Sequence, residues 1–123
     1  MSKGIYNDKY FLNYPEEADK EGLLYVVVLV NKATSKRECV KIGITKGRNW
    51  KDAIKRSRGF NGYEIRIQKT VTGRLEDIYY LEQYLHELWA EHRYFGALKF
   101  GGHTELFSID KLKEIIASVP DKP

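Results

Sequence analysis

The sequence predicts an α+β fold in which helices flank a small three-stranded antiparallel sheet. Three observations support this prediction: an eight-residue apolar segment suited to a buried strand, a polar turn that leads into a second strand, and a long segment with helical spacing of apolar residues. The 123 residues, of which 42% are hydrophobic and 31% charged, are enough for one folded domain. We assign residues 1–21 to an N-terminal arm and residues 22–119 to the domain.

The predicted strands are recognised by their composition. Residues 23–30 are β-branched, aromatic and uninterrupted by polar side chains, which is typical of a central strand buried on both faces. Residues 31–36 are polar and turn-forming, and residues 38–44 partly alternate between polar and apolar. These two strands therefore form a β-hairpin, and the alternating residues 63–71 supply the third strand.

The predicted helices follow from apolar spacing. A helix is expected from about residue 50 to residue 57, before Gly59 and Gly62. Residues 75–94 carry apolar side chains three to four positions apart, so they form the longest helix and cover one face of the sheet. Asp110 is expected to cap a last helix that runs to about residue 118. The aromatic and polar arm is expected to hold one short helical turn.

Composition narrows the classes of protein to consider. The longest apolar run has eight residues, far fewer than the roughly 20 that a transmembrane helix needs. The N-terminal residues also do not contain the apolar region of a secretory signal. We therefore expect a cytoplasmic protein that does not bind membranes. Cys39, the single cysteine, is expected to pack inside its strand. The net charge of +4 suits a polyanionic partner without identifying one.

Short motifs lie along these elements in a fixed order. The hairpin carries Gly22-Leu23-Leu24-Tyr25 and then Lys41-Ile42-Gly43-Ile44-Thr45. Arg56 follows on the next helix, and Leu81-Glu82-Gln83-Tyr84-Leu85-His86 and Thr104-Glu105-Leu106-Phe107 come later. This series resembles the phage-type branch of the GIY-YIG nuclease superfamily, in which KIGIT commonly forms the second half of the motif. The literal string Gly4-Ile5-Tyr6 is rejected because no buried strand follows it.

The resemblance implies a metal-dependent DNA endonuclease, with a site-specific nickase of phage or mobile-element origin as one form. It also implies that the protein acts in the cytoplasm of a bacterium or of a phage-infected host. It implies that Tyr25 deprotonates or orients the attacking water and that Arg56 binds the non-bridging phosphate oxygens. It also implies that Glu82 holds one Mg²⁺ or Mn²⁺ against the leaving 3′ oxygen. A free tyrosine has a pKa of about 10, so nearby positive charge from Lys41 would help Tyr25 act as a base.

Glu82 is also singled out without the resemblance. It shares a helical face with Ile78, Leu85 and Trp89, where an unpaired carboxylate is costly, so a metal ion or an arginine is expected beside it. His86 lies on the same face and is expected to hydrogen-bond Glu82 or contact phosphate. A zinc site built on Glu82 and His86 would need a third ligand, for which His92 and His103 are candidates.

Each assignment has a structural alternative. Tyr25 could be an ordinary core residue, and Lys41 could be a surface lysine that points away from its strand. Arg48 or Arg58 could take the role of Arg56. A further acid, Glu105, either assists the metal or closes the domain through an ion pair.

The segment after KIGIT is rich in basic residues, and these are expected to contact the DNA backbone: Lys46, Arg48, Lys51, Lys55 and Arg58. A solvated helix face would account for them equally well.

The sequence leaves open a monomer or a homodimer. It also leaves open an inactive DNA-binding or antagonist protein, in which the lysine in place of the second motif tyrosine would indicate lost catalysis. A protein-interaction domain is a third alternative. The combination of Tyr25, Arg56 and Glu82 favours the enzyme.

Overall fold

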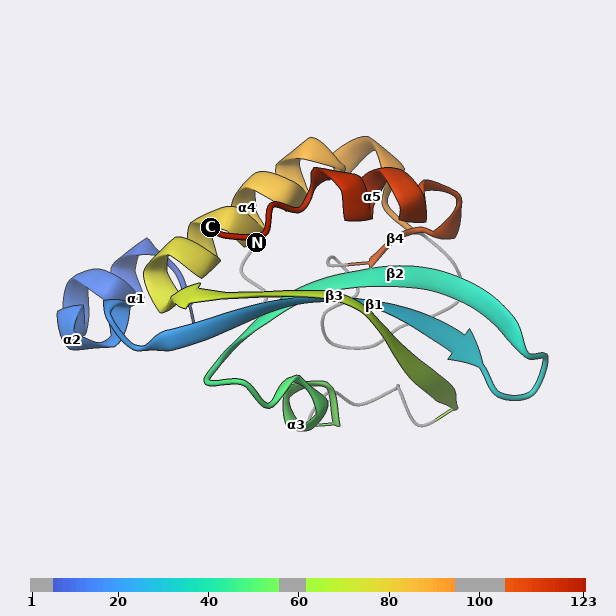
Figure 1. The fold of residues 1–123 in the computed structure, drawn as a ribbon, viewed down its shortest axis with the longest axis horizontal. Helices are drawn as coiled ribbons and strands as arrows, with labels where there is room; N and C mark the ends of the chain where they lie inside the picture. The colour runs from blue at the N-terminus through green and yellow to red at the C-terminus, as the bar shows by residue number, and fades with distance from the viewer. Residues whose placement is uncertain (1–5, 56–61, 95–105) are drawn as a thin grey trace.

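The computed structural model describes residues 6–55, 62–94 and 106–123. A four-stranded antiparallel sheet with the strand order β3-β1-β2-β4 forms its centre, and helices lie on both faces (Figure 1). The strands are β1 (Glu21–Asn31), β2 (Lys36–Lys46), β3 (Tyr63–Arg74) and β4 (Leu106–Ser108). The helices are α1 (Asp8–Asn13), α2 (Pro15–Ala18), α3 (Trp50–Lys55), α4 (Leu75–Leu88) and α5 (Leu112–Ser118), with 3₁₀ turns η1 (Ala90–His92) and η3 (Ile109–Lys111). The α+β class is therefore confirmed.

Strand β1 is the central strand, as its uninterrupted apolar sequence predicts. It pairs with β2 on one side and with β3 on the other along nearly its whole length. Every residue from Leu23 to Val30 is at most 5% exposed. The register shifts once on each side, between Val26 and Val27 against β3 and between Leu29 and Val30 against β2. Such bulges increase the local twist of a sheet.

The prediction of three strands is wrong, because β4 adds a fourth at the outer side of β2. Leu106 pairs with Lys41, and Phe107 pairs with Val40. Three residues are too few to show an alternating pattern in the sequence. The strand is stabilised by its pairing and by burial of its two apolar side chains, which are 1% and 0% exposed.

The long helix ends earlier than predicted, at Leu88 rather than Tyr94. After Trp89 the chain makes the η1 turn, and Arg93 then forms an antiparallel bridge with Phe107. The backbone N–H of Tyr94 donates to the Leu106 carbonyl oxygen over 3.0 Å. The apolar spacing was misleading because Tyr94 packs in the apolar cluster around Tyr25. The inner face of α4 packs in another cluster, on the opposite face of the sheet.

The predicted cap of the last helix is also wrong. Ser108, not Asp110, is the capping residue, and its side chain accepts a hydrogen bond from the Asp110 backbone N–H. This cap begins the η3 turn, and α5 starts only at Leu112 without a side-chain cap. The helical segment is thus divided into a 3₁₀ turn and a shorter α-helix.

Two apolar clusters lie on opposite faces of the sheet, because neighbouring residues of a strand point to opposite sides. The α4-side core contains Leu24, Val26, Val40, Ile42, Val71, Ile78, Leu85, Phe107, Ile115 and Val119. The Tyr25-side core contains Leu23, Tyr25, Val27, Leu29, Cys39 and Leu106, with Trp50, Tyr63, Ile65 and Tyr94 partly buried against it. Helices α4 and α5 cover the first face, and α3 lies on the second (Figure 1).

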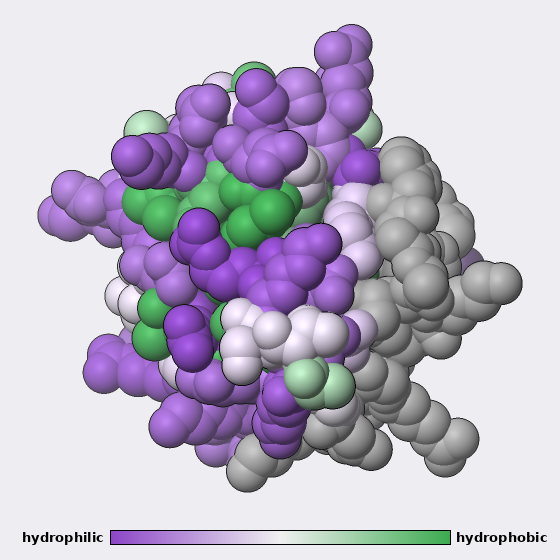
Figure 2. Space-filling view, turned by 90° about the vertical axis from the view of Figure 1, so that its right-hand side faces the viewer, coloured by the Kyte–Doolittle hydropathy of each residue, from purple (hydrophilic) through white to green (hydrophobic). Residues whose placement is uncertain are grey.

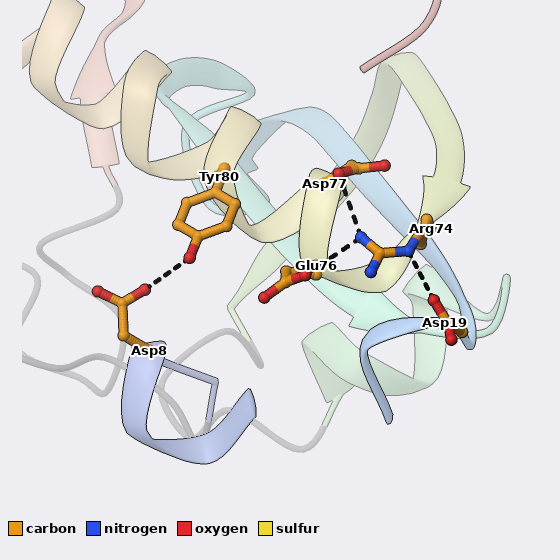
Figure 3. A network of polar contacts seen from close by, with 6 residues as sticks. All are labelled: Asp8, Asp19, Arg74, Glu76, Asp77 and Tyr80. Carbon is orange, nitrogen blue, oxygen red and sulfur yellow. Dashed lines mark hydrogen bonds and ion pairs between the residues drawn. The ribbon is translucent and has the colours of Figure 1, made fainter. Parts of the chain in front are cut away.

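The described part of the arm folds against the beginning of α4. Asn7 caps α1 by accepting from the Tyr10 backbone N–H, and Phe11 and Ala18 pack with Leu75 and Tyr79. Polar contacts surround this packing (Figure 3): Arg74 forms ion pairs with Asp19, Glu76 and Asp77, and the Tyr80 hydroxyl donates to Asp8. Apolar packing and ion pairs together attach the arm to the junction of β3 and α4.

Strand β3 is the outer strand on the other side of the sheet. Its side chains at Glu64, Arg66 and Gln68 are exposed, and Ile67 is 42% exposed.

At the end of the molecule that carries the β1–β2 turn, the surface is largely hydrophilic around a small hydrophobic patch (Figure 2). Within the described ranges, no helix has the length and apolar character needed to cross a bilayer.

Candidate functional site

The structure brings Tyr25 and Lys41 together on one face of the β1–β2 hairpin. Tyr25 pairs with Gly43, and Lys41 pairs with Val27, so both side chains point to the same side of the sheet. The Lys41 Nζ lies 5.8 Å from the centroid of the Tyr25 ring. Lys41 is only 3% exposed, so the alternative of a surface lysine is wrong. A second layer of side chains covers this face, which a strand pattern alone does not reveal.

Tyr25 is itself 3% exposed and belongs to the Tyr25-side core. The pair is therefore largely removed from water, where the attraction between a cation and an aromatic ring is more strongly screened. Cys39 lies in the same cluster, fully buried, which confirms its predicted packing role. Burial raises the pKa of the Cys39 thiol to about 12.

A second pair, Glu82 and His86, lies on the inner face of α4. The two residues are 6% and 5% exposed, next to the fully buried Ile78 and Leu85. This confirms that the carboxylate shares the apolar face of its helix. His86 Nε2 is 3.0 Å from the Ile42 carbonyl oxygen and 3.9 Å from a Glu82 carboxylate oxygen. The shorter contact is a hydrogen bond, and the longer one is an ion pair when the imidazole is protonated.

The two pairs meet at the same segment of β2. Ile42 accepts the contact from His86 through its carbonyl oxygen, and its side chain packs in the α4-side core. The adjoining Lys41 side chain points to the opposite face and lies near Tyr25. Residues 41–43 thus connect an aromatic–cation pair on one face with a carboxylate–imidazole pair on the other.

Three of the proposed or alternative site residues lie outside the described residues: Arg56, Arg58 and Glu105. The helix that precedes Arg56 is described, and it lies on the side of Tyr25. Trp50, the first residue of α3, packs against the Tyr25-side core. Lys55 ends this helix.

Two of the predicted DNA-contacting residues are paired with acids. Lys46 Nζ lies 2.7 Å from Glu17, and Arg48 lies 2.8 Å from Glu21. Hydrogen bonding to Glu17 raises the pKa of Lys46, and the same contact lowers the pKa of Glu17. Lys51 instead lies over the Trp50 ring, with its Nζ 5.8 Å from the ring centroid. The basic segment is therefore partly neutralised by acids from the arm and from the start of β1.

Among the predicted site residues that the structure describes, Glu82 is the carboxylate that could hold a metal ion. Mg²⁺ usually binds one or two carboxylates and completes an octahedral shell with water and phosphate oxygens. In residues 6–55, 62–94 and 106–123, no three His, Cys, Asp or Glu side chains are grouped to hold a metal. His92 lies instead with its ring 5.8 Å from that of Trp89, and His103 lies outside these ranges. A zinc site built on Glu82 and His86 therefore has no third ligand among the described residues.

Sequence reasoning missed a polar group on the Tyr25 side of the sheet. The Tyr94 hydroxyl donates to Glu38 over 2.8 Å, and the Asn31 side-chain amide contacts the same carboxylate at 3.4 Å. Glu38 lies at the register shift of β2, where the pairing passes from Cys39 to Arg37. No local sequence signal marks this position, because the bulge is created by pairing with β1.

Comparison with protein-family models, with curated proteins and with solved structures gave no match for this chain.

Proposed function

We propose that this protein is a divalent-metal-dependent DNA endonuclease of the GIY-YIG type. The observation that carries the proposal is the burial of four ionisable side chains around residues 41–43: Tyr25, Lys41, Glu82 and His86, each at most 6% exposed. Burying charged groups costs free energy, and groups of buried titratable residues are enriched at functional sites. All four residues also belong to motifs that carry the resemblance in the sequence.

Tyr25 and Glu82 lie on opposite faces of the sheet, so in this proposal the scissile phosphate lies at the edge of β2 just after Lys41, where β4 no longer pairs with it. Tyr25 accepts a proton from the water that attacks this phosphate. A phenol is a weak base unless positive charge stabilises its ionised form. The Lys41 ammonium, 5.8 Å from the ring, supplies that charge. Lysine in place of the second motif tyrosine thus has a catalytic use, which argues against decay of the site.

Glu82 would hold one Mg²⁺ or Mn²⁺, and the metal ion would neutralise charge on the phosphate and on the leaving oxygen. His86, anchored on the Ile42 carbonyl, keeps the inner face of α4 fixed against β2. Arg56 binds the non-bridging phosphate oxygens, because a guanidinium group matches their geometry. The basic residues after β2 contact the flanking backbone.

A plasmid-nicking assay tests the proposal. Supercoiled DNA is incubated in Mg²⁺ and in EDTA with wild type, with Glu82→Gln and with the control Glu87→Gln. Glu87 is exposed on the same helix, so the control removes the same charge without touching the site. We expect Mg²⁺-dependent nicking that falls roughly a hundredfold in Glu82→Gln and persists in Glu87→Gln.

The rival function makes a different prediction in the same assay. An inactive DNA-binding or antagonist protein would retain plasmid binding, measured by gel shift, without nicking in Mg²⁺ or in Mn²⁺. That result with folded wild-type protein would refute the nuclease proposal.

A further inference from the structure

The end of the arm lies against the basic segment that follows β2. The Glu17 carboxylate is 2.7 Å from Lys46 Nζ. The Glu21 carboxylate is 2.8 Å from the Arg48 guanidinium. Between these two ion pairs, the Gly47 backbone N–H donates to the Glu21 carbonyl oxygen over 2.8 Å. Residues 46–48 are therefore held against the arm by side chains and by the backbone.

The Glu17 carboxylate is more firmly placed than an ordinary surface acid. Its side chain is 16% exposed, whereas that of Glu21 is 46% exposed. One oxygen, Oε1, accepts from Lys46 Nζ at 2.7 Å and from the Tyr10 hydroxyl at 3.1 Å. The next residue, Ala18, packs in the apolar cluster that joins the arm to α4. Because packing and a second hydrogen bond already fix Glu17, its pairing with Lys46 costs less side-chain entropy than a free surface pair does.

Lys46 is a position where a phosphate can compete with this carboxylate. Carboxylates and phosphates both accept charge-assisted hydrogen bonds from a lysine ammonium. The Lys46 side chain is 47% exposed, so an anion from solvent can reach it. Lys46 is also one of the residues expected to contact the DNA backbone. A DNA strand that approaches this segment therefore meets a cation that the arm has already neutralised.

We propose that Glu17 holds Lys46 in an autoinhibitory contact, which a phosphate of the DNA backbone displaces when the protein binds its substrate. This inference rests on the proposed nuclease function, in which the basic residues after β2 contact the flanking backbone. Phosphate contacts carry no sequence information, so the contact lowers affinity for all DNA alike. The arm thus reduces the time that the protein spends on DNA to which it makes few other contacts.

The test measures DNA affinity in EDTA, where cleavage does not interfere. Fluorescence anisotropy of a short labelled duplex is recorded at several salt concentrations for wild type, Glu17→Gln and the control Glu16→Gln. Glu16 is exposed on the same helix, so the control removes the same charge. We expect Glu17→Gln to bind DNA about threefold more tightly than the control does, with a steeper salt dependence.

A double-mutant cycle with Lys46→Met shows whether Glu17 acts through Lys46. In the Lys46→Met background, Glu17→Gln should change DNA affinity no more than Glu16→Gln does, because the cation that Glu17 holds is absent. Conversely, Lys46→Met should weaken binding more in the Glu17→Gln background than in wild type.

Thermal melts separate this role from a structural one. Glutamine still accepts from the Tyr10 hydroxyl, so Glu17→Gln should melt close to the wild-type temperature. A large loss of its melting temperature would make the ion pair structural and would overturn the inference. Equal DNA affinities of Glu17→Gln and Glu16→Gln would overturn it as well, and so would a gain that persists in Lys46→Met.

The nicking assay and the binding assay fail independently. A wild-type protein that binds DNA and never nicks it refutes the nuclease proposal, yet the cycle still decides the role of Glu17. A wild-type protein that nicks DNA while Glu17→Gln and Glu16→Gln bind alike refutes only the autoinhibitory contact. Failure of every variant to bind DNA at low salt refutes both.

Discussion

Tyr25 lies across Gly43 on the neighbouring strand, in the space that a side chain at residue 43 would fill. The two residues face each other in the register of β1 and β2. A Cβ built on Gly43 would lie 2.6 Å from Tyr25 Cζ and would overlap its hydroxyl oxygen as well. The absence of a side chain at residue 43 is therefore what lets the phenol ring lie over the hairpin.

Gly43→Ala should displace the Tyr25 ring and destabilise the protein. Overpacking of a close-packed interior typically costs about 1–3 kcal/mol, and we expect a loss in that range from urea unfolding. Nicking activity should fall with it, because the ring moves away from Lys41. Gly62→Ala is the matched control, since none of the described residues has an atom within 4 Å of a Cβ there. Equal stability of the two variants would show that the ring can move aside without cost.

His86→Phe should destabilise the packing of α4 on β2. The substitution keeps an aromatic ring but removes the partner of the Ile42 carbonyl oxygen, now 3.0 Å from His86 Nε2. A buried polar group without a partner costs about 1–3 kcal/mol, measurable by chemical denaturation at neutral pH. His92→Phe, at a half-buried position outside this contact, should change the free energy of unfolding much less. A neutral His86→Phe would mean that the hydrogen bond adds nothing to stability.

Tyr94 should make the protein sensitive to alkaline pH. Burial and the hydrogen bond to Glu38 raise the pKa of Tyr94 from 10.0 to about 12. The folded-state pKa of Tyr94 lies above its unfolded value, so the neutral phenol stabilises the folded state. This contribution to the free energy of unfolding is fully present below pH 10 and is lost as the pH rises to about 12. Thermal melts across this window should show a steeper loss for wild type than for Tyr94→Phe. Parallel curves for the two proteins would contradict this assignment.

Cys39 should be unreactive in the native protein. Its side chain is fully buried, and its pKa of about 12 leaves almost no thiolate near neutral pH. Ellman's reagent should therefore titrate no thiol in buffer and one thiol in denaturant. Rapid reaction without denaturant would indicate that β2 opens locally.

Those parts of the fold that depend on local pattern were predictable from the sequence. The apolar residues of β1 identified the central strand, and helical spacing placed Glu82 on the inner face of α4. Strand β4 was missed because Leu106, Phe107 and Ser108 become a strand only by pairing with β2. The burial of Lys41 was missed because alternation indicates which face a side chain points to, but not what covers that face.

The candidate site was likewise predictable from the sequence only in part. Tyr25, Lys41, Glu82 and His86 were identified by motif and spacing, but the contacts between them could not be. The His86–Ile42 and Tyr94–Glu38 contacts join residues 44 and 56 positions apart. Such contacts depend on how α4 and the chain after it pack on the sheet, which no local window of sequence contains.

The outer strand β3 has a consequence for behaviour at high concentration. An edge strand offers unpaired backbone groups to any other chain and can seed aggregation through edge-to-edge pairing. Here Glu64 and Arg66 are exposed along that strand, and the bulge opposite Val26 and Val27 interrupts its regular pairing with β1. Charge and twist both disfavour the pairing of a second copy with this edge of the sheet.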